Sequence, residues 1–267
     1  MLERIFIRIR KKVIGLVEVK GVIFTSKPYV DEIERFRKIS NVKAIILRVD
    51  SPGGAVVPAQ EIYEAIHKAK QDKPVVVSMG SLSASGGYYL ASAANKIFAS
   101  PGTITGSIGV AMHIRNIEEL FTKIGIANSV IKSGEFKDVG SPYRKMTPKD
   151  EKFLQAVADD IYQQFIEAVS KGRKLSPEQV KTLAEGQIFT GKKAKELGLI
   201  DEIGSLNQAI RETARMVGLP EEPHVVSFKR RRKILSEHIM NKAFSHLMLD
   251  LESRSLSLGP LSLIAQM

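Results

Sequence analysis

Residues 74–94 read PVVVSMGSLSASGGYYLASAA, and this stretch decides the fold. Its opening valines are apolar and β-branched, so they predict a buried strand over 74–78. A helix-favouring run follows over 88–94, with Gly86 and Gly87 directly before it. Glycine in the first turn of a helix weakens that helix by up to ~1 kcal/mol relative to alanine. The two glycines, and Ser85 before them, therefore indicate a requirement other than helix stability.

The same alternation of strand and helix extends to both sides of this stretch. Short apolar or β-branched runs predict further strands, and helical spacing of apolar residues predicts helices. The expected strands lie at 13–19, 42–49, 96–99, 107–113 and 127–132, and the expected helices at 29–38 and 56–70. This order predicts an α/β fold with a mostly parallel sheet flanked by helices.

The second half of the chain is more helical. Thr147, Pro148 and two acidic residues form a typical helix start, and an amphipathic helix is expected from there to about residue 171. Further helices are expected from residue 176, over 191–203 and over 205–217. We therefore expect one α/β domain over 1–227, helical from about 148, and a basic and then apolar extension over 228–267.

Composition excludes several functions. The 267 residues are 43% hydrophobic and 26% charged, which is ordinary for a globular protein, and they include no cysteine for disulfides or thiolate metal sites. The net charge of +11 is concentrated near the amino terminus and in the 229–233 cluster. Because neither cluster contains interleaved aromatic residues, we expect no nucleic-acid partner, whereas a membrane surface remains a possible one.

The chain has no run of ~18 apolar residues, so we expect no transmembrane helix. A peripheral membrane location and a cytoplasmic one are both compatible with the sequence. The tail from Ser255 to Met267 is uncharged and mostly apolar. It is a candidate to dock on another subunit, on lipid or in an active site.

Two glycine-rich turns carry the candidate chemistry. Ser85 stands where a strand ends and a helix begins, and the amide of Gly86 is placed there to stabilise negative charge on a substrate oxygen. The turn at Gly53 and Gly54 ends the preceding strand, and its amides supply a second donor. Ligands of parallel sheets bind beyond the carboxyl ends of the strands, so the two turns are expected to face one cleft.

A serine nucleophile needs a base. Of the five histidines, only His113 lies near the predicted strand ends of the α/β half. The rival is Lys137, which lies in a glycine-flanked loop and would have to be buried to lose its charge. Spacing along the sequence does not decide between these two residues.

Several short motifs together resemble one family. The ordered set closely resembles the signal peptide peptidase A family of serine peptidases and covers roughly residues 13–217. The motifs are DSPGG at 50–54, ASGGYY at 84–89, TGSIGV at 105–110, KSGEFKD at 132–138, EGQIFTGKKA at 185–194 and LGLIDEIG at 197–204.

The resemblance implies a crotonase-like fold shared with the Clp protease, and a serine–lysine dyad that needs no metal or cofactor. It makes Ser85 the nucleophile and Lys137 the general base, with Ser107 orienting the lysine amine. The oxyanion hole it implies consists of Gly53, Gly54 and Gly86.

The resemblance also implies an assembly and a substrate. Family members form rings, with eight subunits in the short bacterial form, and degrade released signal peptides and other apolar peptides. Tyr88 and Tyr89 would then face apolar substrate. The family usually carries an amino-terminal membrane anchor, which we do not expect in this chain.

Three alternatives remain at this stage. A Clp-like peptidase would pair Ser85 with His113 and an aspartate. A crotonase would use the same fold to process acyl-CoA. A non-catalytic scaffold would use the basic ends to bind a membrane surface.

Overall fold

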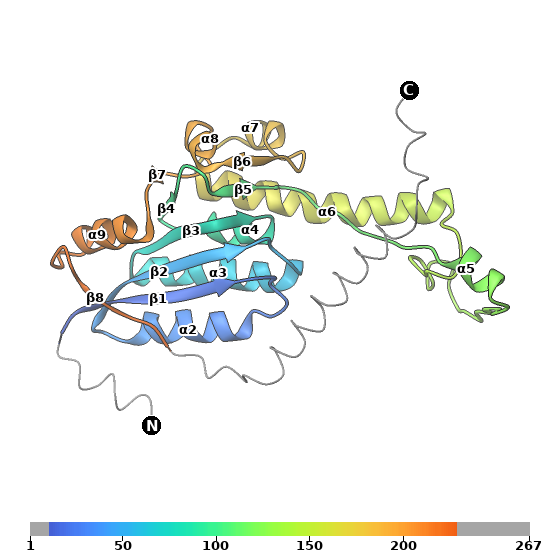
Figure 1. Ribbon diagram of the computed structural model, residues 1–267, viewed down its shortest axis with the longest axis horizontal. Helices are drawn as coiled ribbons and strands as arrows, with labels where there is room; N and C mark the ends of the chain where they lie inside the picture. Colours follow the sequence, from blue (N-terminus) through green and yellow to red (C-terminus); the bar gives the residue numbers. More distant parts are fainter. Residues whose placement is uncertain (1–10, 229–267) are drawn as a thin grey trace, which may run out of the picture. The chain divides into compact units, whose positions relative to one another are not determined.

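The computed structural model describes residues 11–228, in which eight strands form one mixed, mostly parallel sheet (Figure 1). The chain divides after Ser227 into two units, and the fold described here is that of the first. The 229–233 basic cluster and the apolar tail singled out above lie outside the described residues.

Three long strands form the centre of the sheet. They are β1 (Val13–Lys20), β2 (Val42–Ser51) and β3 (Val75–Ala84), which lie parallel in the order β1-β2-β3. The amino-terminal half of β3 pairs with β4 (Lys96–Ala99), and its carboxyl-terminal half pairs with β5 (Ile104–Gly106). As a result, β2, β3 and β5 bring their carboxyl ends to one edge of the sheet.

Shorter strands complete the sheet. β8 (His224–Val226) lies parallel to β1, and β7 (Glu202–Ile203) lies parallel to β4. β6 (Ile188–Thr190) pairs with β5 and is antiparallel to it.

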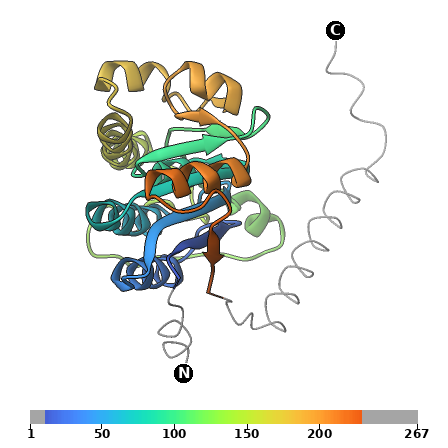
Figure 2. The same cartoon turned by 90° about the vertical axis from the view of Figure 1, so that its left-hand side faces the viewer.

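Helices cover both faces of the sheet, which explains why the central strands are continuously apolar. On one face, Ile14, Ile46 and Val76 pack with alanines of α9 (Leu206–Met216). On the other face lie α2 (Lys27–Lys38), α3 (Val56–Asp72) and α4 (Gly86–Ala91) (Figure 2). α2 packs so closely that a side chain on Gly15 of β1 would meet the ring of Phe36 at 2.6 Å.

The expected helix start at Thr147 is confirmed. α6 (Pro148–Arg173) begins with a capping box in which the Thr147 hydroxyl accepts from the Asp150 amide and the Asp150 carboxylate accepts from the Thr147 amide. α7 (Pro177–Thr182) begins at Ser176 with the same arrangement.

Several predicted bounds were wrong. β3 runs on to Ala84, and α8 (Gly191–Glu196) ends well before residue 203, where β7 follows. Neither 107–113 nor 127–132 is a strand. The end of the first range and all of the second belong to an exposed segment, residues 111–146, that we call the arm. The arm contains a helix that the sequence analysis missed, α5 (Glu118–Lys123). The apolar run around Ile131 predicted burial, but in this chain that side chain is fully exposed.

Among residues 11–228, none of the helices is both long enough and apolar enough to cross a bilayer.

The end of α6 is tied to the sheet by an ion pair whose removal should be measurable. Arg173 donates two hydrogen bonds to Asp201, whose carboxylate also accepts from the amide of Ile97. The Arg173 side chain is only 6% exposed, so Arg173→Ala should lower the free energy of unfolding by about 2 kcal/mol.

The control is Arg215→Ala. Arg215 pairs with Glu212 on the surface, where its side chain is 61% exposed, so its loss should cost less than about 0.5 kcal/mol. Denaturant unfolding of both variants gives the comparison. Equal losses would contradict the importance of the Arg173 pair.

Candidate active site

Ser85 occupies the junction between β3 and α4 in a strained backbone conformation. Its φ is 51° and its ψ is −124°, values that cost a non-glycine residue of order 1–3 kcal/mol. The Ser85 amide donates to the carbonyl of Gly106 at 2.9 Å, which holds the junction against β5. The Ser85 side chain does not cap α4, so the hydroxyl is available for other chemistry.

The two glycine-rich turns pack backbone against backbone. A Cβ built on Gly53 would lie 2.6 Å from the amide nitrogen of Gly86 and 2.9 Å from the Cβ of Ser85. A Cβ on Gly54 would lie 2.2 Å from the carbonyl oxygen of Ile23. No side chain fits at either position, so the DSPGG turn must be glycine for this contact to form.

Two amides are left free at this contact. The Gly53 amide donates to the hydroxyl of Ser51 at 3.0 Å and is therefore occupied. The Gly54 and Gly86 amides have no acceptor among residues 11–228. They lie close together, because a Cβ built on Gly86 would be 3.4 Å from the Gly54 nitrogen. Paired free amides beside a serine form the geometry that stabilises an oxyanion.

Ser107 lies next to Ser85 on the neighbouring strand end. Ala84 of β3 and Gly106 of β5 are register partners, so each serine is the first residue beyond its strand. Ser107 has a φ of 49°, and its amide donates to the carbonyl of Gln187. The structure thus brings together four of the predicted residues with Ser85: Gly53, Gly54, Gly86 and Ser107.

Lys137 lies elsewhere, in the arm. Its side chain is exposed, and among residues 11–228 its ammonium group has no hydrogen-bond acceptor and no contact with Ser85. Figure 1 shows the arm extending away from α4 and the carboxyl ends of the central strands. Within a single chain, the two members of the expected dyad are therefore not brought together.

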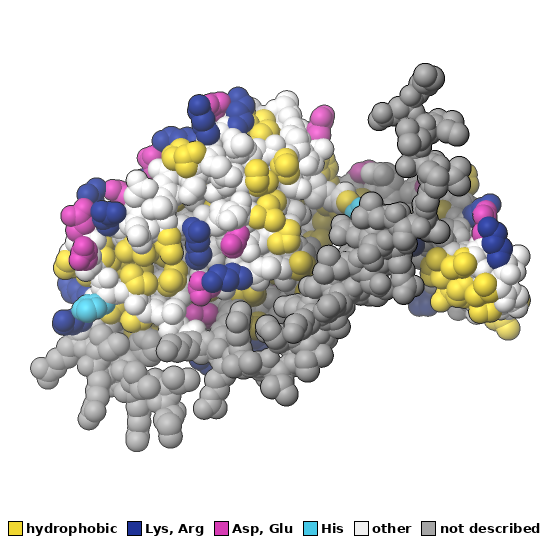
Figure 3. Space-filling view, in the orientation of Figure 1, with side chains coloured by type: hydrophobic (Ala, Val, Ile, Leu, Met, Phe, Trp, Pro, Cys, Tyr) yellow, Lys and Arg dark blue, Asp and Glu magenta, His cyan; other side chains and the backbone are white. Residues whose placement is uncertain are grey.

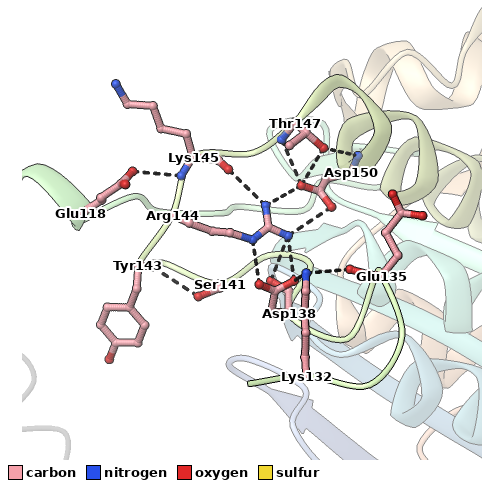
Figure 4. A network of polar contacts seen from close by, with 10 residues as sticks. All are labelled: Glu118, Lys132, Glu135, Asp138, Ser141, Tyr143, Arg144, Lys145, Thr147 and Asp150. Carbon is pink, nitrogen blue, oxygen red and sulfur yellow. Dashed lines mark hydrogen bonds and ion pairs between the residues drawn. The ribbon is translucent and has the colours of Figure 1, made fainter. Parts of the chain in front are cut away.

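Both sequence neighbours of Lys137 are firmly held. Phe136 stacks on Phe153 of α6, with ring centroids 4.6 Å apart. Asp138 accepts hydrogen bonds from Lys132 and from the Arg144 guanidinium, as Figure 4 shows. Lys137 is consequently an exposed side chain between two residues that are held in place.

A group of ion pairs attaches this loop to α6. The Arg144 guanidinium bridges the carboxylates of Asp138 and Asp150, and we call these three residues the arm clamp (Figure 4). Hydrogen bonds from Arg144 hold the pKa of both carboxyls well below the usual range, and Lys132 and Thr147 add to the effect at Asp138 and Asp150 respectively. The sequence analysis missed this clamp, because no local pattern marks three residues at such spacing in a loop.

Two other expected residues are placed differently. Tyr88 does not face a cleft: its side chain is fully buried and its hydroxyl donates to the carbonyl of Leu199 at 2.9 Å. Burial accordingly raises its pKa. His113 is exposed in the arm and, within the described part of the chain, has no carboxylate partner.

The fold has a known counterpart. The chain superposes on a ClpP1 mutant from Listeria monocytogenes with a TM-score of 0.54, covering 78% of this chain and 99% of that one at 16% identity. At this identity the likeness shows the fold alone. It confirms the crotonase/Clp-protease-like fold expected from the sequence.

The matching family model and three similar proteins carry protease or peptidase names. The family model "Peptidase family S49" matches residues 67–219. The putative protease slr0021 of Synechocystis is 43% identical over 78% of this chain and 76% of its own length. The putative signal peptide peptidase SppA of Enterococcus faecium is 35% identical over 70% of this chain and 55% of its length. Protease 4 of Haemophilus influenzae is 39% identical over 71% of this chain, which spans only 31% of that protein.

The family model and the names of these relatives support a serine-type peptidase. The chain belongs to peptidase family S49, the SppA family, as its motifs indicated.

The arm clamp predicts how the pKa values of Asp138 and Asp150 change when Arg144 is replaced. In Arg144→Gln the pKa of Asp138 and of Asp150 should rise toward the ordinary value of about 3.9. Because the folded-state pKa of each is lowered, the clamp stabilises the arm above the ordinary pKa and loses its contribution as the pH falls through the lower one. The variant should lose the part of this contribution that Arg144 supplies, while Lys132 and Thr147 keep theirs.

Carboxyl-carbon NMR titration of the aspartates measures these values. Arg115→Gln is the matched control, because Arg115 is an exposed arm cation without a carboxylate partner among residues 11–228. Unchanged titration of Asp138 and Asp150 in Arg144→Gln would contradict the clamp.

Proposed function

We propose that this protein is a serine endopeptidase that degrades apolar peptides, including released signal peptides, with Ser85 as nucleophile and Lys137 as general base. The observation that carries the proposal is the strained Ser85 beside the free amides of Gly54 and Gly86. Strain of this kind persists only where the surrounding structure imposes it, and it is typical of active sites.

The proposed reaction has two halves. The neutral amine of Lys137 takes the proton of Ser85 as the serine oxygen attacks the peptide carbonyl, and the carbonyl oxygen becomes an anion held by the two free amides. The tetrahedral intermediate then collapses, the C–N bond breaks, and the protonated lysine gives its proton to the leaving amine. Water, deprotonated by the same lysine, attacks the acyl-enzyme; the acyl C–O bond breaks, and the lysine returns the proton to the Ser85 oxygen as the second product leaves.

Lys137 of one copy of the chain would act on Ser85 of a second copy. Lys137 is exposed in the arm, and no side chain among residues 11–228 neutralises or buries it. Burial against another subunit would disfavour the charged form of Lys137 and favour the neutral amine. A general base must be neutral to accept a proton. Ser107, one strand away from Ser85, would accept a hydrogen bond from the incoming amine and orient it.

The surface of the arm supports assembly. Figure 3 shows apolar side chains gathered on this part of the molecule. The exposed apolar residues of the arm include Met112, Ile114, Leu120, Ile124, Ile126, Val130, Ile131, Tyr143 and Met146. Apolar surface on this scale is typical of protein interfaces. We propose that it joins copies into a closed ring, for which the family resemblance implies eight subunits.

Apolar side chains beside the oxyanion donors support the substrate class. Ile23 pairs by its backbone with the Gly53–Gly54 turn, and its neighbours Val22 and Phe24 are 49% and 79% exposed. A peptide carbonyl bound at the free amides would bring apolar substrate residues against them. Signal peptides are apolar and are left at membranes, so we also propose that the protein acts at a membrane surface.

The alternatives receive less support. A Clp-like triad would require a carboxylate beside His113, and His113 has none within the described residues. A scaffold would not need a strained serine beside two free amides.

The first test is kinetic. General-base catalysis contributes about 10²–10⁴-fold, so Lys137→Ala should lower kcat/KM for an apolar peptide by at least that much. Lys123→Ala, an exposed lysine of the same arm, and His113→Ala should both stay within about twofold of wild type. Full activity in Lys137→Ala would exclude it as the base.

Mixing two inactive variants tests whether the dyad spans two subunits. If each site takes serine from one copy and lysine from another, co-refolded Ser85→Ala and Lys137→Ala chains should recover about a quarter of wild-type activity, since each half is intact in half of the chains. No recovery is expected when the dyad lies within one chain. If mixed assemblies, verified by mass, are no more active than either variant alone, the shared site is contradicted.

A further inference from the structure

Three buried hydroxyls form a row directly beneath the candidate active site. Ser51 of β2 is the register partner of Ser83 of β3, and Ser83 is the partner of Thr105 of β5. Each of the three residues is 0% exposed. Register partners project to the same face of a sheet, so the three hydroxyls lie side by side. We call Ser51, Ser83 and Thr105 the hydroxyl row.

The hydroxyl row lies at a constant offset of two residues from the site residues. Each member lies two residues before a site residue: Ser51 before Gly53, Ser83 before Ser85, and Thr105 before Ser107. Because strands repeat every two residues, the row forms the layer immediately below the site. A buried apolar side chain would fill such positions equally well for packing alone, so three hydroxyls in register require another explanation.

Each hydroxyl binds the backbone of the site. The Ser51 hydroxyl accepts from the Gly53 amide at 3.0 Å. The Ser83 hydroxyl donates to the carbonyl of Gly87, in the first turn of α4, at 3.3 Å. The Thr105 hydroxyl donates to the carbonyl of Ser83 at 2.7 Å. The row thereby connects the Gly53–Gly54 turn, the start of α4 and β5.

We propose that the hydroxyl row positions the two oxyanion donors, with Ser51 fixing the peptide that precedes Gly54 and Ser83 fixing the turn that contains Gly86. This inference rests on the proposed function of the site. Ser51 and Ser83 touch no reacting atom; they are positioning residues. By occupying the Gly53 amide, Ser51 also selects which amide of the turn remains free for substrate.

Two variants, Ser51→Ala and Ser83→Ala, test the effect of the hydroxyl row on the rate of catalysis. In Ser51→Ala the buried Gly53 amide loses its acceptor and the turn can shift. Misplacement of catalytic groups by about 1 Å costs about 100-fold, so kcat should fall by roughly 10–100-fold while KM changes less than about twofold. Ser83→Ala should show the same split.

A peptide aldehyde supplies a readout that a merely structural role would not move. The aldehyde forms a tetrahedral adduct with an oxyanion, so its inhibition constant should rise by the factor by which kcat/KM falls. Ser92→Ala is the matched control: Ser92 is also 0% exposed and its hydroxyl bonds to the Tyr89 carbonyl, at the far end of α4. The control should keep kcat, KM and aldehyde affinity within about twofold.

Backbone exchange separates failure of this inference from failure of the proposed function. Hydrogen exchange of the Gly53 amide, followed by mass spectrometry with residue-level fragmentation, needs no enzyme activity. Ser51→Ala should accelerate it about tenfold or more, and Ser92→Ala should not. If wild type lacks peptidase activity, the proposed function fails, and accelerated exchange still supports the positioning of the turn. Unchanged Gly53 exchange, or unchanged kcat and aldehyde affinity in an active Ser51→Ala enzyme, overturns the hydroxyl row.

Discussion

The site depends on a contact between two stretches of backbone that carry no side chains. The turn after β2 and the start of α4 approach so closely that a methyl group on Gly53 would overlap the Gly86 amide. At this approach, two amides beside a serine have no acceptor within the described part of the chain. Glycine here costs helix stability, and the compensation is a pair of donors whose positions are set before any substrate binds.

The surrounding fold maintains this contact from below and from the side. β3 is long enough to pair with β4 along one half and β5 along the other, which places Ser107 beside Ser85. The Ser85 amide is held by β5, and the buried hydroxyls of Ser51 and Ser83 hold the turns on either side. Strain at Ser85 is tolerated because each neighbouring segment is bonded in place.

The sequence predicted what depends on local chemistry. Continuous apolar runs such as 75–77 marked buried strands, and the glycines marked two turns whose backbones meet, because both signals are carried by adjacent residues. The hydroxyl row was not predicted, since it depends on a register shift between Val49 and Ser51 that no local pattern encodes. Tyr88 was misassigned because an aromatic residue near a nucleophile can equally serve the core. The 127–132 run predicts a strand but is exposed, because an apolar pattern indicates burial without saying what covers it.

A structure of the protein after reaction with a peptide phosphonate tests the central claim most directly. Such a reagent bonds to an activated serine and leaves a phosphoryl oxygen where the oxyanion would form. The account predicts phosphorus on the Oγ of Ser85 and that oxygen within about 3 Å of both the Gly54 and Gly86 nitrogens. A protein that is left unmodified, that is modified at another serine, or whose phosphoryl oxygen points away from these two amides would contradict it.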